Sequence, residues 1–163
     1  DDPAAPLFGF VSRLDPQKGV GALFAAMPRF VEAGAQLAML GDGAEEYRRG
    51  ITALSARYPD RVGGALEFNA GLARRIYAGS DFFLMPSKFE PCGLAQMIAA
   101  RFGSIPIVAR TGGLADTIRE GEGGNGFLFP TPVTLDDGIW IPAAGFVLAI
   151  AVPRALRVFG DMK

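Results

Sequence analysis

Short apolar runs alternate along this chain with segments of helical periodicity, and this alternation constrains the fold more than any other feature of the sequence. The runs that we predict to be strands are 7–12, 36–40, 61–68, 81–85, 105–109 and 126–129. The segments that we predict to be helices or helical turns are 19–33, 44–57, 71–78, 93–102 and 113–119. Continuous apolar strands are covered on both faces, which is typical of a parallel sheet. The sequence therefore predicts an α/β fold, a doubly wound and mostly parallel sheet with helices on both faces.

The composition fits one ordinary domain and excludes several kinds of chemistry. The chain has 163 residues, of which 50% are hydrophobic and 20% charged, so it can bury a core. Its net charge of −1 argues against a dedicated nucleic-acid or anionic-membrane surface. Histidine is absent, which excludes histidine triads, histidine zinc ligands and a histidine general base. The single cysteine, Cys92, excludes an internal disulfide.

The pattern fails after Pro130. Segment 138–152 is almost wholly apolar, but it is shorter than the roughly 20 residues that a membrane helix needs, and a proline and a glycine interrupt it. We assign residues 1–130 to one α/β domain, and 131–163 to an atypical apolar tail that we expect to be a helix packed on the same domain. No signal peptide is visible and the chain lacks a start methionine, so we expect a piece of a longer protein.

The loops that follow three predicted strands carry residues suited to bind an anion. Ligands of a doubly wound sheet bind at the carboxyl ends of its strands. Arg13 offers a bidentate fork and Lys18 a compact charge, while the N–H groups of Gly93 and Leu94 lie where a helix is predicted to begin. Taken singly, each cation is equally well explained as a solvated loop charge. Together with Glu90, the set predicts a nucleotide donor whose attached group is held by the carboxylate.

Common nucleotide-binding and metal-binding motifs are missing. The turn after the first predicted strand is Ser-Arg-Leu, so a dinucleotide oxidoreductase with a G-x-G-x-x-G loop is not expected. No Walker A loop occurs, and the glycines on either side of Asp42 fit a tight turn equally well. Asp42, Glu45 and Glu46 fit a solvated helix start better than a metal site. We therefore expect no metal site.

Four motifs, in this order and spacing, resemble the C-terminal domain of bacterial glycogen synthase and plant starch synthase. They are Val11-Ser-Arg-Leu-Asp-Pro-Gln-Lys-Gly19, Arg75-Ile-Tyr-Ala-Gly-Ser-Asp-Phe-Phe-Leu-Met-Pro-Ser87, Phe89-Glu-Pro-Cys-Gly-Leu94 and Arg110-Thr-Gly-Gly-Leu-Ala-Asp116. The resemblance runs from about residue 6 to residue 129. It implies that residues 1–130 are a nucleotide-sugar-binding, Rossmann-like domain, one half of a GT-B enzyme. The implied enzyme is a retaining glycosyltransferase that works without a metal or other cofactor. That enzyme transfers glucose from ADP-glucose to the non-reducing end of an α-1,4-glucan.

The resemblance also implies roles for individual residues. The implied catalytic residues are Arg13 and Lys18, which would bind the donor diphosphate and stabilise negative charge as ADP leaves, and Glu90, which would hold the glucose hydroxyls. The implied substrate-binding residues are Phe68, Cys92, Gly93, Leu94, Ala95, Thr111, Gly112 and Gly113. Phe68 lies where the family often stacks an aromatic ring on adenine, although a core strand residue is an equally good interpretation. Cys92 is interpreted as a packed thiol, because no base is available to activate it.

The sequence also departs from the family. Ala95 stands where a threonine is common, Arg74 stands where a histidine is frequent, and the tail does not match. The resemblance also implies an N-terminal acceptor domain, through which the glucan would mainly bind and which we expect these 163 residues not to include. We therefore expect the isolated chain to bind ADP or ADP-glucose weakly and not to elongate glucan. We expect no nucleic-acid or membrane partner, and a location in the cytoplasm of a bacterium or the plastid of a plant. A UDP- or GDP-sugar transferase and a non-catalytic nucleotide-sugar-binding module remain alternatives.

Overall fold

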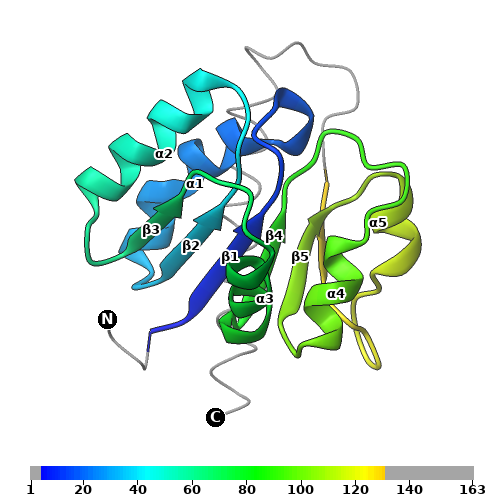
Figure 1. Ribbon diagram of the computed structural model, residues 1–163. Helices are drawn as coiled ribbons and strands as arrows, with labels where there is room; N and C mark the ends of the chain where they lie inside the picture. The colour runs from blue at the N-terminus through cyan, green and yellow to red at the C-terminus, as the bar shows by residue number, and fades with distance from the viewer. Residues whose placement is uncertain (1–4, 131–163) are drawn as a thin grey trace.

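The computed structural model describes residues 5–130, so the predicted tail helix lies outside the described residues. A parallel sheet forms the centre of the molecule, in the strand order β3-β2-β1-β4-β5-β6 (Figure 1). The strands are β1 (Leu7–Val11), β2 (Gln36–Leu40), β3 (Val62–Ala65), β4 (Phe82–Met85), β5 (Ile105–Ala109) and β6 (Phe127–Phe129). The order reverses between β1 and β4, and this is where a doubly wound sheet binds its ligands.

Helices cover both faces of the sheet. They are α1 (Val20–Glu32), α2 (Glu45–Arg57), α3 (Ala70–Gly79), α4 (Ala95–Arg101) and α5 (Gly112–Thr117). Successive strand residues point to opposite faces, so two separate cores form. Phe8 and Phe10 join the core beneath α1 and α2, whereas Phe83 and Met85 join the core beneath α3, α4 and α5. Figure 1 shows α3 and α4 on the near face of the sheet. The predicted fold class is thereby confirmed.

Helix α3 lies close against β1, and the sequence of β1 explains why. A Cβ atom at Gly9 would lie only 2.9 Å from Ile76 Cγ2 of α3, and it would also meet the Ser80 hydroxyl. Any larger side chain would push the helix away from the sheet. Gly9 therefore allows α3 to pack closely against β1. Helices α3 and α4 then lie side by side over the strands whose ends carry the candidate site.

The predicted elements agree with the observed ones except at some ends. The third strand was expected over 61–68, but β3 ends at Ala65, since Asn69 accepts a hydrogen bond from the Leu72 N–H and starts α3. The fourth helix was expected from residue 93, but Gly93 has φ +69° and α4 begins at Ala95. Within the described residues, no helix has the length and apolar character to cross a membrane.

Candidate functional site

Three loops, which follow β1, β4 and β5, meet at the carboxyl edge of the sheet as the sequence predicts. The Lys88 N–H donates to the Gln17 carbonyl at 2.8 Å, and Gln17 Nε2 donates to the Phe89 carbonyl at 2.9 Å. On the other side, the Gly113 N–H donates to the Glu90 carbonyl at 2.9 Å. The loop after β4 is thus tied to both of its neighbours, which fixes the three loops relative to one another.

A short 3-10 turn, η1 (Pro16–Lys18), carries Lys18 into this site. Asp15 caps the turn by accepting the Lys18 N–H at 3.1 Å, and Gly19 ends it at φ 69°, a left-handed conformation that favours glycine. Lys18 Nζ lies 2.6 Å from Glu90 Oε2, and the two side chains are only 16% and 10% exposed. Ser87 Oγ lies 3.4 Å from the same carboxylate oxygen. The structure therefore brings together the lysine and the carboxylate that the sequence singled out.

Arg13 differs from Lys18 in its surroundings. Its side chain is 72% exposed, and its Nη1 lies 3.1 Å from Asp15 Oδ2. An exposed ion pair of this kind contributes about 1 kcal/mol or less. The guanidinium can therefore exchange Asp15 for a more highly charged anion at small cost.

A small pocket of about 240 Å³ opens at the edge between these side chains. The predicted site residues that line it are Arg13, Lys18, Glu90, Gly93, Leu94 and Ala95. The N–H groups of Gly93 and Leu94 donate no hydrogen bond to another described residue. The pocket thus offers two cations, one carboxylate and two backbone donors, which suits a phosphate next to a group rich in hydroxyls.

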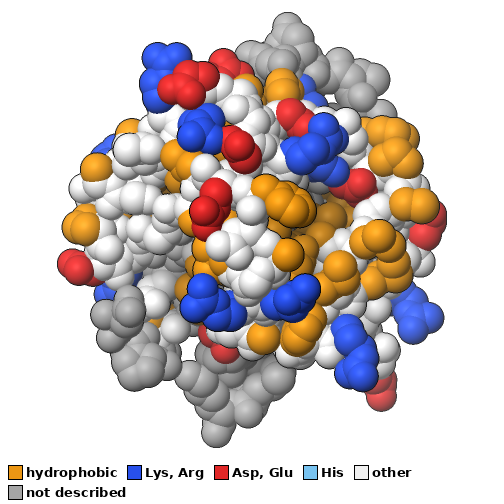
Figure 2. Space-filling model, viewed as in Figure 1, with side chains coloured by type: hydrophobic (Ala, Val, Ile, Leu, Met, Phe, Trp, Pro, Cys, Tyr) orange, Lys and Arg blue, Asp and Glu red, His pale blue; other side chains and the backbone are white. Residues whose placement is uncertain are grey.

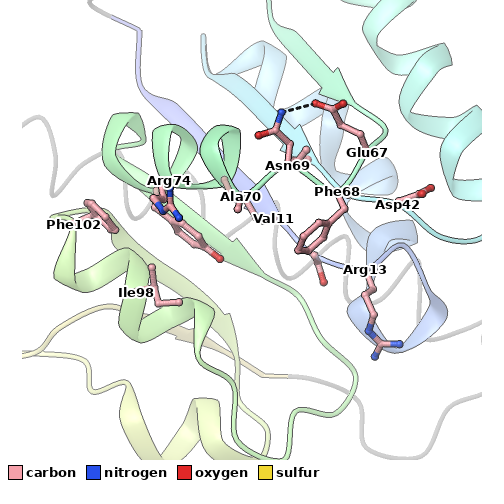
Figure 3. A pocket seen from close by; sticks show the side chains of 15 residues that line it. Val11, Arg13, Asp42, Glu67, Phe68, Asn69, Ala70, Arg74, Ile98 and Phe102 are labelled. Atoms are coloured by element: carbon pink, nitrogen blue, oxygen red, sulfur yellow. Dashed lines mark hydrogen bonds between the residues drawn. The ribbon is translucent and has the colours of Figure 1, made fainter.

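A larger and mainly apolar pocket of about 560 Å³ adjoins the small one (Figure 3). The two share a wall formed by Val11, Ser12 and Arg13 at the end of β1. Figure 3 shows Phe68 and Arg13 at one end of the large pocket, and Ile98 and Phe102 at the other. In Figure 2, hydrophobic side chains gather around a hollow over α3 and α4, with basic side chains at its rim. This pocket has the size and character to hold a flat, partly apolar ring system.

Phe68 belongs to the large pocket and not to the core. It is 94% exposed, because β3 ends at Ala65 and the chain has left the sheet before it reaches the phenyl ring. The interpretation of Phe68 as a core strand residue is therefore wrong. A large aromatic side chain this exposed at a pocket mouth offers a free face on which a nucleobase can stack.

The polar groups of the large pocket come from α3 and from the loops that follow β1, β2 and β3. Arg74, noted in the sequence as a departure, lies at the end away from Phe68 (Figure 3). Glu67 accepts a hydrogen bond from Asn69 Nδ2 at 2.9 Å. Burial raises the pKa of the Tyr77 phenol above its usual value of 10.0, so the hydroxyl stays protonated at neutral pH.

The remaining predicted substrate-binding residues line neither pocket. Cys92 is an exposed free cysteine, so its interpretation as a packed thiol is wrong. Thr111, Gly112 and Gly113 form the start of α5 beneath the loop after β4. A Cβ at Gly113 would collide with the backbone of Cys92, and one at Gly112 would collide with the Glu90 carbonyl. These two glycines let α5 support the loop at backbone distance.

Glu45 and Glu46 lie in the first turn of α2, as the sequence predicts. Asp42 pairs with Arg48, and Glu45 lies 3.5 Å from both Arg48 Nε and Arg49 Nε. Within the part of the chain that the structure describes, no group of three acidic or cysteine side chains is arranged to hold a metal ion. That no metal is needed stays a prediction.

Two buried polar residues near the site, Ser87 and Gln96, were not predicted from the sequence. Gln96 of α4 is fully buried, and its Nε2 donates to the carbonyls of Cys92 and Gly93. The available signal was its place three residues before Ala99, on the inward face of a helix that otherwise buries only apolar side chains. A polar residue on such a face requires hydrogen-bond partners.

The family model of glycosyl transferases group 1 matches residues 2–138 of the chain. A glycogen synthase from Xanthomonas axonopodis pv. citri is 52% identical over 126 residues, which cover 77% of this chain and 26% of that protein. A glycogen synthase from Myxococcus xanthus is 49% identical over 161 residues, which cover 99% of this chain and 31% of that protein. The chain therefore spans about a quarter to a third of the length of these curated relatives.

A solved structure is also similar. The catalytic domain of starch synthase IV from Arabidopsis thaliana, bound to ADP and acarbose, superposes with a TM-score of 0.77 at 36% identity. The match covers 95% of this chain and 32% of that one.

Proposed function

The chain belongs to the group 1 glycosyl transferases, and on that premise we propose that it is the donor-binding domain of an ADP-glucose-dependent glycogen or starch synthase. On this proposal, residues 1–130 bind the nucleotide sugar, and the glucan binds mainly to another part of the enzyme. The similarity to two bacterial glycogen synthases supports the choice of enzyme. Since those relatives are bacterial, we expect the protein to act in the cytoplasm rather than in a plastid.

The observation that carries the proposal is the pair of adjoining pockets. The large apolar pocket, with Phe68 at its mouth, has the character of a nucleoside site. The small pocket beside it holds Lys18 and Glu90, and Arg13 stands in the wall between the two. Nucleoside, diphosphate and sugar follow one another in the same order in a nucleotide sugar. A single donor molecule can therefore occupy both pockets at once.

The chemistry follows from the charges around the small pocket. When glucose is transferred, the bond between its anomeric carbon and the phosphate oxygen breaks, and the electron pair leaves with ADP. The glucan hydroxyl oxygen forms the new bond to the same carbon, and its proton passes to the departing phosphate. Arg13 and Lys18 would stabilise the negative charge that develops on the diphosphate, and two such cations can serve in place of a metal ion. Glu90 would hold the sugar hydroxyls and orient the ring as positive charge develops at the anomeric carbon. The N–H groups of Gly93 and Leu94 would contact phosphate.

Binding of nucleotides to the 163-residue chain tests the proposal. We expect calorimetric titration to show weak binding of ADP and ADP-glucose, and weaker binding of UDP-glucose. Arg13→Ala should lower the affinity for ADP by about tenfold, as expected when a charge-assisted hydrogen bond is lost. Because the Arg13 side chain is largely exposed, the variant should fold normally. Arg119→Ala, another exposed arginine and one that lines neither pocket, is the control.

Two results would contradict the proposal. Preferential binding of a UDP- or GDP-sugar would favour a related transferase with another donor. If Glu90→Gln left the transfer activity of the intact protein unchanged, a non-catalytic nucleotide-sugar-binding module would be the better interpretation.

A further inference from the structure

Gln96 lies directly beneath the turn that joins Glu90 to α4. Its side chain is fully buried, and Nε2 lies 3.0 Å from the Gly93 carbonyl oxygen and 3.3 Å from the Cys92 carbonyl oxygen. A third contact, at 3.1 Å to Thr117 Oγ1, ties the amide to α5. The buried amide nitrogen of Gln96 thus lies within hydrogen-bond distance of both consecutive carbonyl oxygens of the turn.

The direction of these carbonyls determines where two N–H groups point. In a trans peptide, the C=O of one residue and the N–H of the next point in opposite directions, and no cis peptide is present among the described residues. The Cys92 carbonyl is paired in this way with the Gly93 N–H, and the Gly93 carbonyl with the Leu94 N–H. Holding both carbonyls inward therefore turns both N–H groups away from Gln96.

Both residues that carry these N–H groups line the small pocket, and neither group donates to another described residue. We propose that Gln96 is a positioning residue, which holds the Gly93 and Leu94 N–H groups toward the diphosphate of the donor. This inference rests on the proposed function, because it needs a phosphate in the small pocket. Gln96 itself is buried and touches no part of the donor.

The chemistry of the site selects glutamine over similar side chains. Glutamate would present oxygen to two carbonyl oxygens and could donate no hydrogen bond as a carboxylate. Gln96 Oε1 is buried and has no hydrogen-bond partner among the described residues, so the side chain gives up one hydrogen bond in order to donate its others. A Cβ at Gly93 would lie 2.6 Å from Gln96 Oε1 and 3.0 Å from Nε2, so the close approach also requires glycine at 93, where φ is +69°.

The test compares the affinities of the 163-residue chain for ADP and for adenosine, which differ only in the diphosphate. Gln96→Met keeps the length of the side chain but removes its hydrogen bonds. We expect the ratio of ADP affinity to adenosine affinity to fall about tenfold, with adenosine binding unchanged. In NMR titrations, the Gly93 and Leu94 amide signals should shift with ADP in the original chain and lose this response in the variant. Met97→Ala, on the exposed side of the same helix, is the control and should keep the ratio.

The possible outcomes separate this inference from the proposed function. If the original chain prefers ADP to adenosine, Arg13→Ala reduces that preference and Gln96→Met does not, the positioning role is wrong and the donor site stands. If the original chain shows no preference for ADP, the donor site fails and the inference fails with it. Should Gln96→Met not fold, Thr117→Val removes the contact of Gln96 to α5, together with the hydrogen bond that Thr117 Oγ1 donates to the Gly113 carbonyl, and a two- to threefold fall in the ratio is expected. An unchanged ratio in that variant would overturn the inference.

Discussion

The two pockets share the wall at Arg13, yet they are built in different ways. In the small pocket, Lys18 and Glu90 are nearly buried, and hydrogen bonds fix the three loops around them. In the large pocket, Phe68, Ile98 and Phe102 are 94%, 39% and 48% exposed. The Lys18–Glu90 pair of the small pocket is therefore part of what stabilises the fold, whereas these three exposed side chains of the large pocket are not part of the core. Substitutions in the buried pair should affect stability and binding together, and substitution of an exposed side chain such as Phe68 should affect binding alone.

The largest effect is expected from Lys18→Ala. Removal of the lysine leaves the Glu90 carboxylate nearly buried and without its cation, which typically destabilises a protein by about 3–5 kcal/mol. Urea unfolding followed by circular dichroism measures the change. Arg29→Ala is the control, because the Arg29–Glu32 pair is also a single contact between a cation and a carboxylate oxygen but is exposed, and its loss should cost under about 1 kcal/mol.

A double variant sharpens this result. If the cost comes from an unpaired buried charge, replacement of Glu90 by Leu in the Lys18→Met background should restore most of the stability. If Lys18→Ala and Arg29→Ala lowered the free energy of unfolding equally, the Lys18–Glu90 pair would add no more stability than an exposed ion pair.

The second prediction concerns the close contact beneath the small pocket. Gly113→Ala places a methyl group against the backbone of Cys92, so the loop or α5 must move, at a cost of about 1–3 kcal/mol. Gly79→Ala is the control, because that position, also in a helix, has open space around it. Alanine there should stabilise by up to about 1 kcal/mol. Thermal unfolding of the two variants should therefore shift in opposite directions, and shifts of equal sign would remove the role given to Gly113.

The third prediction concerns the large pocket. Phe68→Ala should leave the free energy of unfolding within about 0.5 kcal/mol of the original, because the ring is almost wholly exposed. The affinity of the Phe68→Ala variant for ADP should nevertheless fall by about tenfold, since stacking of an aromatic ring on a base contributes about 1–3 kcal/mol. Calorimetry measures the affinity and chemical unfolding the stability. A clear loss of stability with no loss of affinity would reverse the distinction between the pockets.

Much of the fold and part of the site could be predicted from the sequence, for physical reasons. Apolar runs and helical periodicity determine the elements, and the parallel order brings the ends of β1, β4 and β5 to one edge. Lys18 and Glu90, which are 72 residues apart, could be placed together on that basis. The resemblance to glycogen and starch synthases is likewise confirmed by the relatives and by the starch synthase structure.

Other features depend on local hydrogen bonds and turns, which the pattern of apolar residues does not reveal. The apolar run of 61–68 continues past Ala65, and only the cap formed by Asn69 shows that the strand has ended and that Phe68 is exposed. The role of Gln96 could not be predicted for a different reason. Its role depends on which way two carbonyls point, and this direction follows from the left-handed turn at Gly93 rather than from any periodicity.

The smallest effect is expected from Ala95→Thr, which tests whether the small pocket holds phosphate. Ala95 lines that pocket at the first residue of α4, where the family commonly has a threonine. A hydroxyl there should add one hydrogen bond to the bound phosphate and raise ADP affinity by about fivefold, or about 1 kcal/mol. Ala95→Val is the matched control, because valine has the shape of threonine and a similar helix propensity but no hydroxyl. If both variants bind ADP alike, the phosphate lies out of reach of residue 95, and the donor must enter the small pocket from another direction.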